Sequence, residues 1–438
     1  MKYRPYLSYK DSGVEWLGKI PKHWDVMRFG TNARFVVPMR DKPPLLNGPI
    51  PWIRIEDFDG KYIESSKTNQ GVDQNTVHEM NLKVFHIGTV LCSCSCDMGA
   101  TAIIRSLLVS NQTFIGIVPG RNYDPEYVYY LMQVAKQHLT AVATGAIQQY
   151  LPKNDFSSLR MPVFPLREQR EIASFLDRET AKIDALIERK ERLIELLQEK
   201  RTVLITQAVT KGLDPNVPMK DSGVEGLGKI PQHWEVKRLW HLTPEDRQIM
   251  YGIVLPGPNV DIGVPIVKGG DVSAERLRVD RLSKTTFDIE AGYVRSRLRG
   301  GDLVYAIRGS IGEVAIVPDE LTGANLTQDA ARIAHNGTIV GQWLLYVLKS
   351  MAVFCQLDAG SVGAAVRGIN IRDLKRVLVP VPPPNEQQII ADYLESKTAK
   401  IDALLDKVSS ITKTLGEYRM ALISGAVKGQ FRVNGDLT

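Results

Sequence analysis

Apolar side chains recur every three or four residues along two long stretches of the chain. The first stretch, Arg167–Ala208, contains no proline or glycine. A narrow apolar stripe of this period predicts two helices of about 40 residues that pair as a coiled coil. The stripe positions are Ile172, Leu176, Ile183, Ile187, Ile194, Leu197, Leu204 and Ala208 in the first copy, and Ile390, Leu394, Ile401, Leu405, Thr412, Leu415, Leu422 and Ala426 in the second.

The two stretches belong to a repeat that covers most of the chain. Thr180–Leu186 reappears as Thr398–Leu404, an offset of 218 residues (398 − 180). An earlier block, Lys10–Arg28, returns as Lys220–Arg238, an offset of 210 residues (220 − 10). The segments between block and helix differ in the two copies. We call these differing segments the inserts. Two inserts that differ, each between a repeated block and a repeated helix, predict one scaffold that presents two different recognition surfaces.

The inserts combine short apolar runs with Gly, Asn and Pro, a pattern typical of strands joined by loops. One helix is expected in each insert, over Tyr127–Leu139 and Gln342–Phe354. The fold class is therefore α+β. The expected strands are Pro51–Glu56, Gly88–Cys94, Thr101–Arg105, Val264–Lys268, Gly301–Arg308 and Val314–Val317.

A pseudo-twofold axis is the simplest relation between the two halves, and it would make the long helices antiparallel. Each insert leads directly into its own helix, so antiparallel pairing would separate the inserts by on the order of 65 Å. The expected segments are 1–160 as an N-terminal insert domain with the block 10–28, 161–212 as the first long helix, 213–379 as the block 220–238 and a C-terminal insert domain, 380–429 as the second long helix, and 430–438 as a tail.

Composition adds modest constraints. A net charge of +6 and a pI near 8.9 favour a polyanionic partner only weakly. No apolar run approaches the roughly 18–20 residues that a membrane span needs, so no membrane association is expected. Four cysteines in 438 residues do not make a disulfide framework, which favours a cytoplasmic location.

Four sets of motifs stand out along the chain. They are the twin blocks around Trp16–Trp24 and Gly226–Trp234, Gly301–Gly312, the proline-rich Pro380–Gln387, and the two Thr-Ala-Lys-Ile-Asp helices. Together these motifs resemble one known family, the specificity subunit of type I restriction-modification systems. The resemblance covers essentially the whole chain, in order and in duplicate. It implies two target-recognition domains, each reading one half of a split double-stranded DNA sequence, held apart by the paired helices.

The same resemblance implies partners for this chain. These are two modification subunits that bind S-adenosylmethionine and methylate adenine, and motor-nuclease restriction subunits that use ATP and Mg²⁺. The chain itself is expected to bind no cofactor or metal and to have no catalytic residues. Its residues agree, because we find no phosphate-binding loop, no His-Glu-x-x-His and no adenine-methylation motif. Pro383-Pro384-Asn385 is interpreted as a helix stop and cap.

Two arginine motifs in the second insert are candidate DNA contacts. Arg295, Arg297 and Arg299 alternate, so on a strand they would share one face and could meet phosphates. A solvated strand face is the alternative. Arg308 and Ser310 flank Gly309 in an expected exposed turn, where arginine suits guanine edges and serine suits either base. The alternative there is a plain β-turn.

The matching turn of the first insert aligns Gly99 with Gly312, so Ser95 stands where the second insert has Arg308. This difference favours different half-site sequences. A Gly-containing stretch leads out of each insert. These stretches contain side chains that suit base or phosphate contact, namely Gln148, Gln149, Tyr150 and Arg367. Such stretches could equally be domain-closing loops. Asn111-Gln112 and Thr327-Gln328 are weaker candidates.

Two further patterns have structural interpretations that we prefer. Cys92, Cys94 and Cys96 would share a strand face, where burial is favoured over a zinc site because the spacing is wrong for tetrahedral ligands. The repeated His-Trp pairs at 23–24 and 233–234 are expected to build the frame rather than a site. The rival function is a coiled-coil protein-interaction adaptor with two binding modules.

Overall fold

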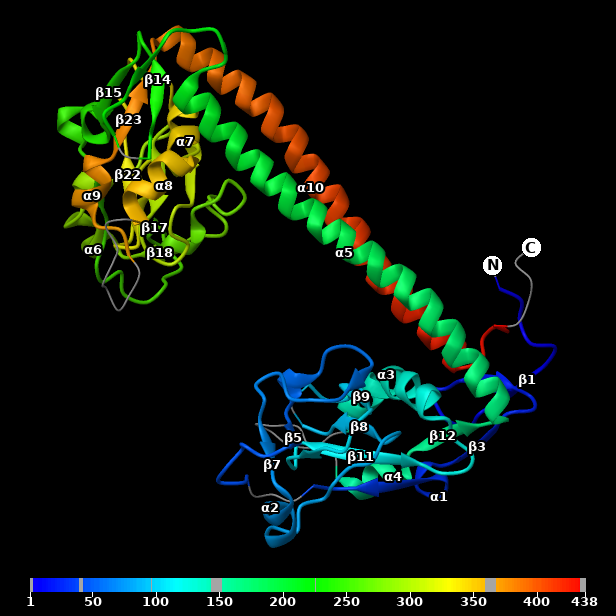
Figure 1. Ribbon diagram of the computed structural model, residues 1–438. Coiled ribbons are helices and arrows are strands. Elements are labelled where there is room, and N and C mark those ends of the chain that lie inside the picture. Colours follow the sequence, from blue (N-terminus) through cyan, green and yellow to red (C-terminus); the bar gives the residue numbers. More distant parts are fainter. Residues whose placement is uncertain are drawn as a thin grey trace. The chain divides into compact units, whose positions relative to one another are not determined.

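The computed structural model describes residues 3–38, 42–95, 97–142, 152–224, 226–358 and 368–433. The chain divides into two compact units, Met1–Lys190 with Ser410–Thr438, and Glu191–Ser409. The long helices are α5 (Leu166–Lys211) and α10 (Pro384–Val427), and each unit contains a part of both (Figure 1). Within the described ranges, no helix combines the length and apolar character that crossing a membrane requires.

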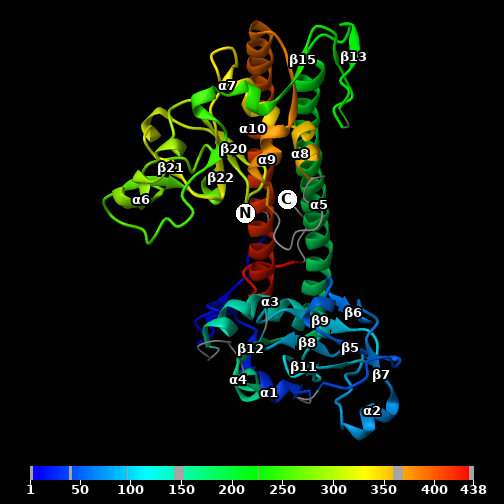
Figure 2. The same cartoon turned by 90° about the vertical axis from the view of Figure 1, so that its left-hand side faces the viewer.

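The first unit is built on a five-stranded sheet of order β4-β11-β8-β9-β6 and a three-stranded sheet of order β10-β5-β7. Helix α3 (Pro125–Val142) packs on β8 and β9 (Figure 2). The strands are β4 (Ala33–Val36), β5 (Ile50–Ile53), β6 (Tyr62–Ile63), β7 (Gly71–Val72), β8 (Val90–Ser93), β9 (Thr101–Ile104), β10 (Val109–Ser110) and β11 (Phe114–Pro119). The shorter elements are β1 (Tyr9–Asp11), β2 (Lys19–Pro21), β3 (Asp25–Arg28), α1 (Phe29–Asn32), η1 (Ile55–Asp57), α2 (Gln74–Glu79), α4 (Lys153–Ser158) and β12 (Arg160–Val163).

The second unit repeats this plan with a four-stranded sheet of order β16-β22-β19-β20 and a three-stranded sheet of order β18-β17-β21. Helix α7 (Gly341–Lys349) packs on β20, and α8 (Met351–Asp358) follows it. The strands are β13 (Met219–Asp221), β14 (Lys229–Pro231), β15 (Glu235–Arg238), β16 (Met250–Tyr251), β17 (Val264–Val267), β18 (Ser283–Thr285), β19 (Leu303–Ala306), β20 (Val314–Ile316), β21 (Asn325–Leu326), β22 (Ala330–Ile333) and β23 (Leu378–Val381). The remaining elements are η2 (Leu239–Leu242), η3 (Glu245–Arg247), η4 (Gly269–Asp271), α6 (Phe287–Ala291), η5 (Val294–Ser296), η6 (Asp319–Leu321) and α9 (Ile371–Arg376).

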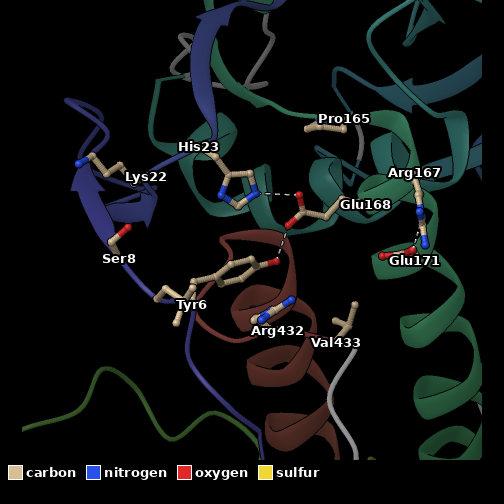
Figure 3. Close-up of a pocket in the computed structure, with 11 residues that line it drawn as sticks. Tyr6, Ser8, Lys22, His23, Pro165, Arg167, Glu168, Glu171, Arg432 and Val433 are labelled. Carbon is tan, nitrogen blue, oxygen red and sulfur yellow. Dashed lines mark hydrogen bonds and ion pairs between the residues drawn. The ribbon is translucent and has the colours of Figure 1, made fainter.

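A glutamate in the first turn of each long helix binds the repeated block of the same unit. The carboxylate of Glu168 accepts a hydrogen bond from Trp24 Nε1 (3.2 Å) and lies 2.9 Å from His23 Nε2 (Figure 3). Glu386 holds Trp234 Nε1 and His233 Nε2 at 3.0 and 2.8 Å. Both indole rings are fully buried. The expected structural role of the His-Trp pairs is therefore confirmed.

Tyr6 completes this contact in the first unit only. Its hydroxyl donates to Glu168 Oε1 over 2.6 Å, and burial together with the nearby carboxylate raises the pKa of Tyr6 (Figure 3). A cavity of about 590 Å³ opens beside it, lined among others by Lys22 and Arg432. At the position of Tyr6, the second block has Asn216. The frame is thus repeated, while the surface around it differs between the copies.

Two ion pairs show that the long helices run antiparallel. In the first unit, Arg419 Nε binds Asp184 Oδ1 at 2.7 Å. In the second unit, Arg201 Nε binds Asp402 Oδ1 at 2.8 Å. The step from Asp184 up to Arg201 on α5 equals the step from Arg419 down to Asp402 on α10 (201 − 184 = 419 − 402), as antiparallel pairing requires. The predicted antiparallel coiled coil is confirmed, and every predicted stripe position is buried or half-buried.

Three predicted elements differ from the structure. The strand expected over Pro51–Glu56 ends at Ile53, and Ile55–Asp57 form the 3₁₀ helix η1. The helix expected over Gln342–Phe354 is broken at Ser350, which leaves the helical conformation (φ −77°, ψ 152°) and whose hydroxyl donates to the carbonyl of Val347 (2.6 Å). The strand expected through Arg295–Arg299 is wrong. That segment is the 3₁₀ turn η5 followed by irregular chain. The guanidinium of buried Arg332 donates to the carbonyls of Arg295 (2.5 Å) and Arg297 (3.2 Å), so these acceptors bond to a side chain rather than to a neighbouring strand.

A glycine follows the end of each long helix, and we expect alanine to destabilise the protein more at one of them than at the other. Gly429 and Gly212 both have positive φ, +68° and +74°. A Cβ at Gly429 would lie 2.5 Å from Pro21 and 3.0 Å from Trp24, whereas at Gly212 its nearest neighbour would be 3.3 Å away. We expect Gly429→Ala to lower the free energy of unfolding by about 2 kcal/mol or more, and Gly212→Ala by less.

Gly416→Ala is the matched control for this prediction. Gly416 lies inside α10 with open space around it, so alanine there should stabilise the protein by about 0.5–1 kcal/mol. Urea unfolding of the three variants measures the order. If the Gly429→Ala protein were as stable as the wild type, close packing of this glycine on Trp24 would be refuted.

Candidate nucleic-acid interface

One turn has the same main-chain hydrogen bonds in both units. In the first unit, Gly99 N–H donates to Ser93 O (2.9 Å) and Ser93 N–H donates to Ala100 O (2.8 Å). In the second, Gly312 N–H donates to Ala306 O (3.1 Å) and Ala306 N–H to Glu313 O (2.8 Å). Both closing glycines have positive φ, +82° and +90°. The turns therefore correspond, and Ser95 and Arg308 occupy the same position of the two frames.

A second loop lies against each turn. Cys94 N–H donates to Thr113 O (2.9 Å) in the first unit, and Ile307 N–H donates to Asp329 O (2.9 Å) in the second. These bonds place the loops after β10 and β21 beside the turns. The candidates Asn111-Gln112 and Thr327-Gln328 occur in these loops, with a glutamine at the equivalent position of each.

The short helices η1 and η4 form the third part of the arrangement. A basic residue precedes each one, and its N–H donates to an aspartate three residues later: Arg54 to Asp57 (2.7 Å) and Lys268 to Asp271 (2.9 Å). Gly269 of η4 lies so close to the turn that a Cβ would be 2.4 Å from the Arg308 carbonyl oxygen. Sequence analysis did not single out Arg54 or Lys268. The sequence signal for them was a basic residue that directly follows an apolar strand and precedes an aspartate by three positions.

We call these three segments together a recognition platform. The first platform consists of residues 54–57, 94–99 and 111–113, of which residue 96 lies outside the described ranges, and the second consists of residues 268–271, 307–312 and 327–329. The main chain of the two platforms is alike, whereas most of their side chains differ. Such an arrangement suits recognition of two different targets by one scaffold.

Arg308, Gly309 and Ser310 are exposed on the second platform, and Gly309 has φ +71°. The chain leaving the insert returns to this turn, because Ile369 N–H donates to Ile307 O (2.8 Å) and a Cβ on Gly368 would lie 3.5 Å from Arg308 Cγ. The candidate Arg367 directly precedes this point and lies outside the described residues, as do Gln148, Gln149 and Tyr150 in the first unit.

The first platform has different chemistry. Ser95 is half-buried and forms an isolated β-bridge with Asp97, whose backbone has φ +46°. The Asp97 carboxylate binds Lys136 of α3 at 2.7 Å. Arg54 Nη1 pairs with Glu56 at 3.0 Å, and Arg54 Nε has no hydrogen-bond partner. Besides Arg54, this platform presents hydroxyl, carboxylate and amide groups, and Ser95 stands where the second one presents Arg308.

The arginine row lies at the other end of β19 from Arg308. Arg295, Arg297 and Arg299 are all exposed, separated by buried Ser296 and Leu298. Arg297 is occupied, because its guanidinium binds buried Glu290 through two contacts of 2.6 Å. The hydrogen bond from Arg297, against an opposing effect of burial, holds the pKa of Glu290 below its ordinary value. The structure thus separates the row from the platform.

The cysteines of the first sheet are packed in its core. Cys92 and Cys94 are buried, and burial raises the pKa of the Cys92 thiol to about 12. Cys96 lies outside the described residues. In the part of the chain that the structure describes, no three His, Cys, Asp or Glu side chains are grouped so that they could hold a metal ion. Burial of Cys92 and Cys94, the preferred interpretation, is confirmed.

Comparison with known proteins gives one consistent family. The family model described as type I restriction modification DNA specificity domain matches residues 39–196 and 259–411. The MjaIX specificity subunit of a type I restriction enzyme from Methanocaldococcus jannaschii is 30% identical over 99% of this chain and 98% of its own length. The EcoBI specificity subunit from Escherichia coli is 25% identical over 76% of this chain and 72% of its own.

A solved structure has the same fold. It comes from work on complex assembly and conformational transition of the type I R-M system, and it superposes with a TM-score of 0.64 over 94% of this chain and 99% of that one, at 19% identity. Two family-model matches fall on the two inserts and their helices, and a relative of 30% identity spans nearly the whole chain. The chain therefore belongs to the family of type I restriction-modification DNA specificity subunits, the non-catalytic components that recognise DNA sequence.

Proposed function

We propose that each recognition platform reads one half of a split DNA target. The observation that carries this proposal is the pair of equivalent turns, which have the same main-chain bonds and different side chains at the same position, Ser95 and Arg308. A common frame sets how a platform meets a groove, and the exchanged side chains decide which bases it accepts.

The platform residues divide by chemistry into two groups. Arg308 and Ser310 are exposed and suit base edges, since arginine binds guanine through two hydrogen bonds. Arg54 and Lys268 occupy equivalent positions and are basic in both units, as expected for phosphate contacts that do not depend on sequence. Arg295, Arg299 and, outside the described residues, Arg367, Gln148, Gln149 and Tyr150 are proposed as further DNA contacts. Arg297 is a weaker candidate because Glu290 already binds it.

The proposed partners follow from family membership. Two modification subunits would bind S-adenosylmethionine and methylate adenine, and restriction subunits would use ATP and Mg²⁺. The repeated blocks support two similar partners, because Glu168 and Glu386 hold the same His-Trp frame in both units. We propose the cytoplasm as the location, where the free thiols of Cys92, Cys94 and Cys355 would stay reduced. The adaptor alternative is not supported, since the relatives are DNA specificity subunits.

Arg308→Ala tests the reading role. In cells that carry the chain with its modification subunits, mapping methylated adenines should give a two-part target for the wild type. The variant should lose discrimination at a base of one half-site, a loss of about 1–3 kcal/mol if arginine binds guanine there. The other half-site and the spacer should stay the same.

Arg295→Ala is the matched control, an exposed arginine at the opposite end of β19. It should weaken DNA binding evenly across sequences and reduce the salt dependence, with all base preferences retained. Unchanged base preference in Arg308→Ala would refute the reading role. A wild-type protein that directs no sequence-dependent methylation would refute the proposed function as a whole.

We also propose that the number of residues in the helix pair sets the spacer between the half-sites. Removing one heptad from each helix, residues 194–200 of α5 and 403–409 of α10, preserves the facing positions defined by Arg201 and Asp402. The spacer should then shorten by at most about three base pairs, the equivalent of about 10 Å of helix. Methylation mapping reads both spacer and half-sites. An unchanged spacer with altered half-sites would contradict this role.

A further inference from the structure

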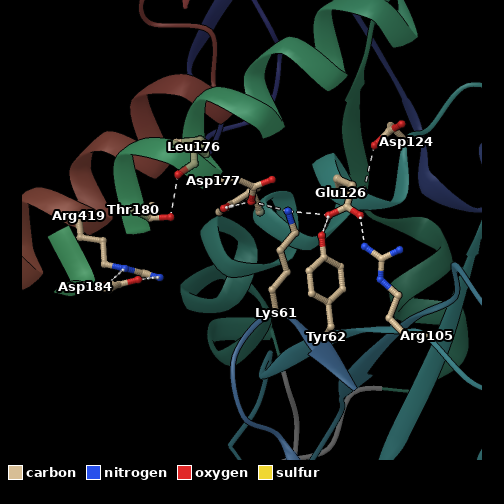
Figure 4. Close-up of polar contacts among 11 residues, drawn as sticks. Lys61, Tyr62, Arg105, Asp124, Glu126, Leu176, Asp177, Thr180, Asp184 and Arg419 are labelled. Carbon is tan, nitrogen blue, oxygen red and sulfur yellow. Dashed lines mark hydrogen bonds and ion pairs between the residues drawn. The ribbon is translucent and has the colours of Figure 1, made fainter. Parts of the chain in front are cut away.

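We propose that Lys61 is a positioning residue that fastens the N-terminal recognition domain to α5 and so fixes how the first platform meets its half-site. The proposal rests on the proposed function and adds a residue to it that touches no DNA. It starts from a mostly buried cation between two partly exposed carboxylates, one on α3 and one on α5 (Figure 4).

The Lys61 side chain is only 12% exposed. Its ammonium lies 2.6 Å from Glu126 Oε2 of α3 and 2.5 Å from Asp177 Oδ1 of α5 (Figure 4). The same nitrogen lies 4.9 Å from the ring centre of Tyr130, 5.5 Å from that of Tyr129 and 5.6 Å from that of Tyr62. Aromatic faces attract a cation, so the rings and the carboxylates hold the ammonium in one place.

Other side chains fix the two carboxylates. Glu126 also accepts from the Tyr62 hydroxyl (2.9 Å) and from Arg105 Nη2 (3.3 Å), and Asp177 accepts from the buried Tyr130 hydroxyl (2.6 Å). Burial opposes the charge on Lys61, but the hydrogen bonds and charges of Asp177 and Glu126 outweigh it and raise its pKa. The Glu126 and Asp177 side chains are 30% and 42% exposed, so these ion pairs add little net stability, and their effect is to favour one geometry.

A short path of main-chain bonds connects this cation to the platform. The Lys61 carbonyl accepts from Ile103 N–H of β9 (2.8 Å), and the next residues form β6, which pairs with β9. Strand β9 pairs with β8, and the turn of the first platform directly follows β8. Movement of the sheet relative to α5 would therefore move the platform with it.

The second unit has different residues at the corresponding positions. Asp124 and Val340 are equivalent, because each gives its N–H to the buried glutamine of its long helix, Gln169 or Gln387. On this alignment Glu126 corresponds to Gln342 and Asp177 to Glu395. Tyr346, the counterpart of Tyr130, bonds instead with Thr398 (3.2 Å).

In the first unit, β6 follows β9 at the edge of the larger sheet. In the described part of the second unit, the larger sheet ends at β20, the counterpart of β9. This fastening is therefore a property of the N-terminal domain. The two recognition domains differ in how their sheets are held, as well as in what they read.

The experiment separates spacer discrimination from base preference. Once the target is mapped, DNA duplexes carrying both half-sites with the native spacer, and with one base pair more or fewer, are titrated with the full complex. The wild type should favour the native spacer by at least roughly tenfold, the cost of a typical mismatch. Lys61→Met should reduce this preference to about threefold or less, with the same bases preferred in both half-sites.

Asp177→Ala is the second variant, because it removes the link to α5 while Lys61 keeps Glu126 and no buried charge is left alone. It should show the same loss of spacer preference even if Lys61→Met fails to fold. Lys182→Met is the matched control. Lys182 forms an exposed pair with Glu179 on the same helix, so its loss should leave spacer preference at the wild-type level.

Three outcomes would overturn the positioning role. A folded Asp177→Ala complex that retains the wild-type spacer preference would do so. If Lys61→Met changed which bases are preferred at the native spacer, Lys61 would take part in base recognition instead. An equal loss in Lys182→Met would show that the effect is not specific to this contact. A wild-type complex without any sequence preference would refute the proposed function instead, so the two failures remain distinct.

Discussion

Both halves of the molecule depend on one carboxylate in the first turn of a long helix. Glu168 and Glu386 each bind an indole N–H and an imidazole nitrogen from the repeated block of their own unit. The indole is buried and could not leave its N–H unpaired without cost. Because this carboxylate ties the repeated block to the start of the long helix, the position of the block relative to that helix is fixed. Conservation of this contact in both units explains why so divergent inserts can share one plan.

The glutamine next to each glutamate extends the same frame into the insert. Gln169 is fully buried, accepts from Asp124 N–H and donates to the carbonyls of Asn122 and Phe164. Gln387 makes the equivalent bonds with Val340 N–H and the carbonyl of Pro382. A single Glu-Gln pair thus connects each long helix to its block on one side and to the helix of the insert on the other.

Sequence reasoning succeeded where a periodic or repeated signal exists. The apolar stripe from Ile172 to Ala208 and its copy predicted the helix pair, and the repeat predicted that the two helices run antiparallel. The alignment of Gly99 with Gly312 was sound because both positions need positive φ, which favours glycine. The break at Ser350 was missed because the apolar pattern continues through it. The strand conformation expected for the arginine row was wrong because its alternation mimics a strand, while buried Arg332, more than thirty residues later, binds two of its carbonyls. Lys61 was missed because its partner on α5 is 116 residues away.

The turns that carry Ser95 and Arg308 are held by bonds between main-chain atoms, which do not depend on the identity of the side chains they display. Replacement of an exposed residue there leaves those bonds intact, and substitutions at exposed positions usually change stability little. If these turns read DNA as proposed, new specificities can arise by mutational drift at a few sites in one half of the gene, without refolding the product. In the evolution of a restriction-modification system, such a division would allow one half of the target to change while the other is inherited unaltered.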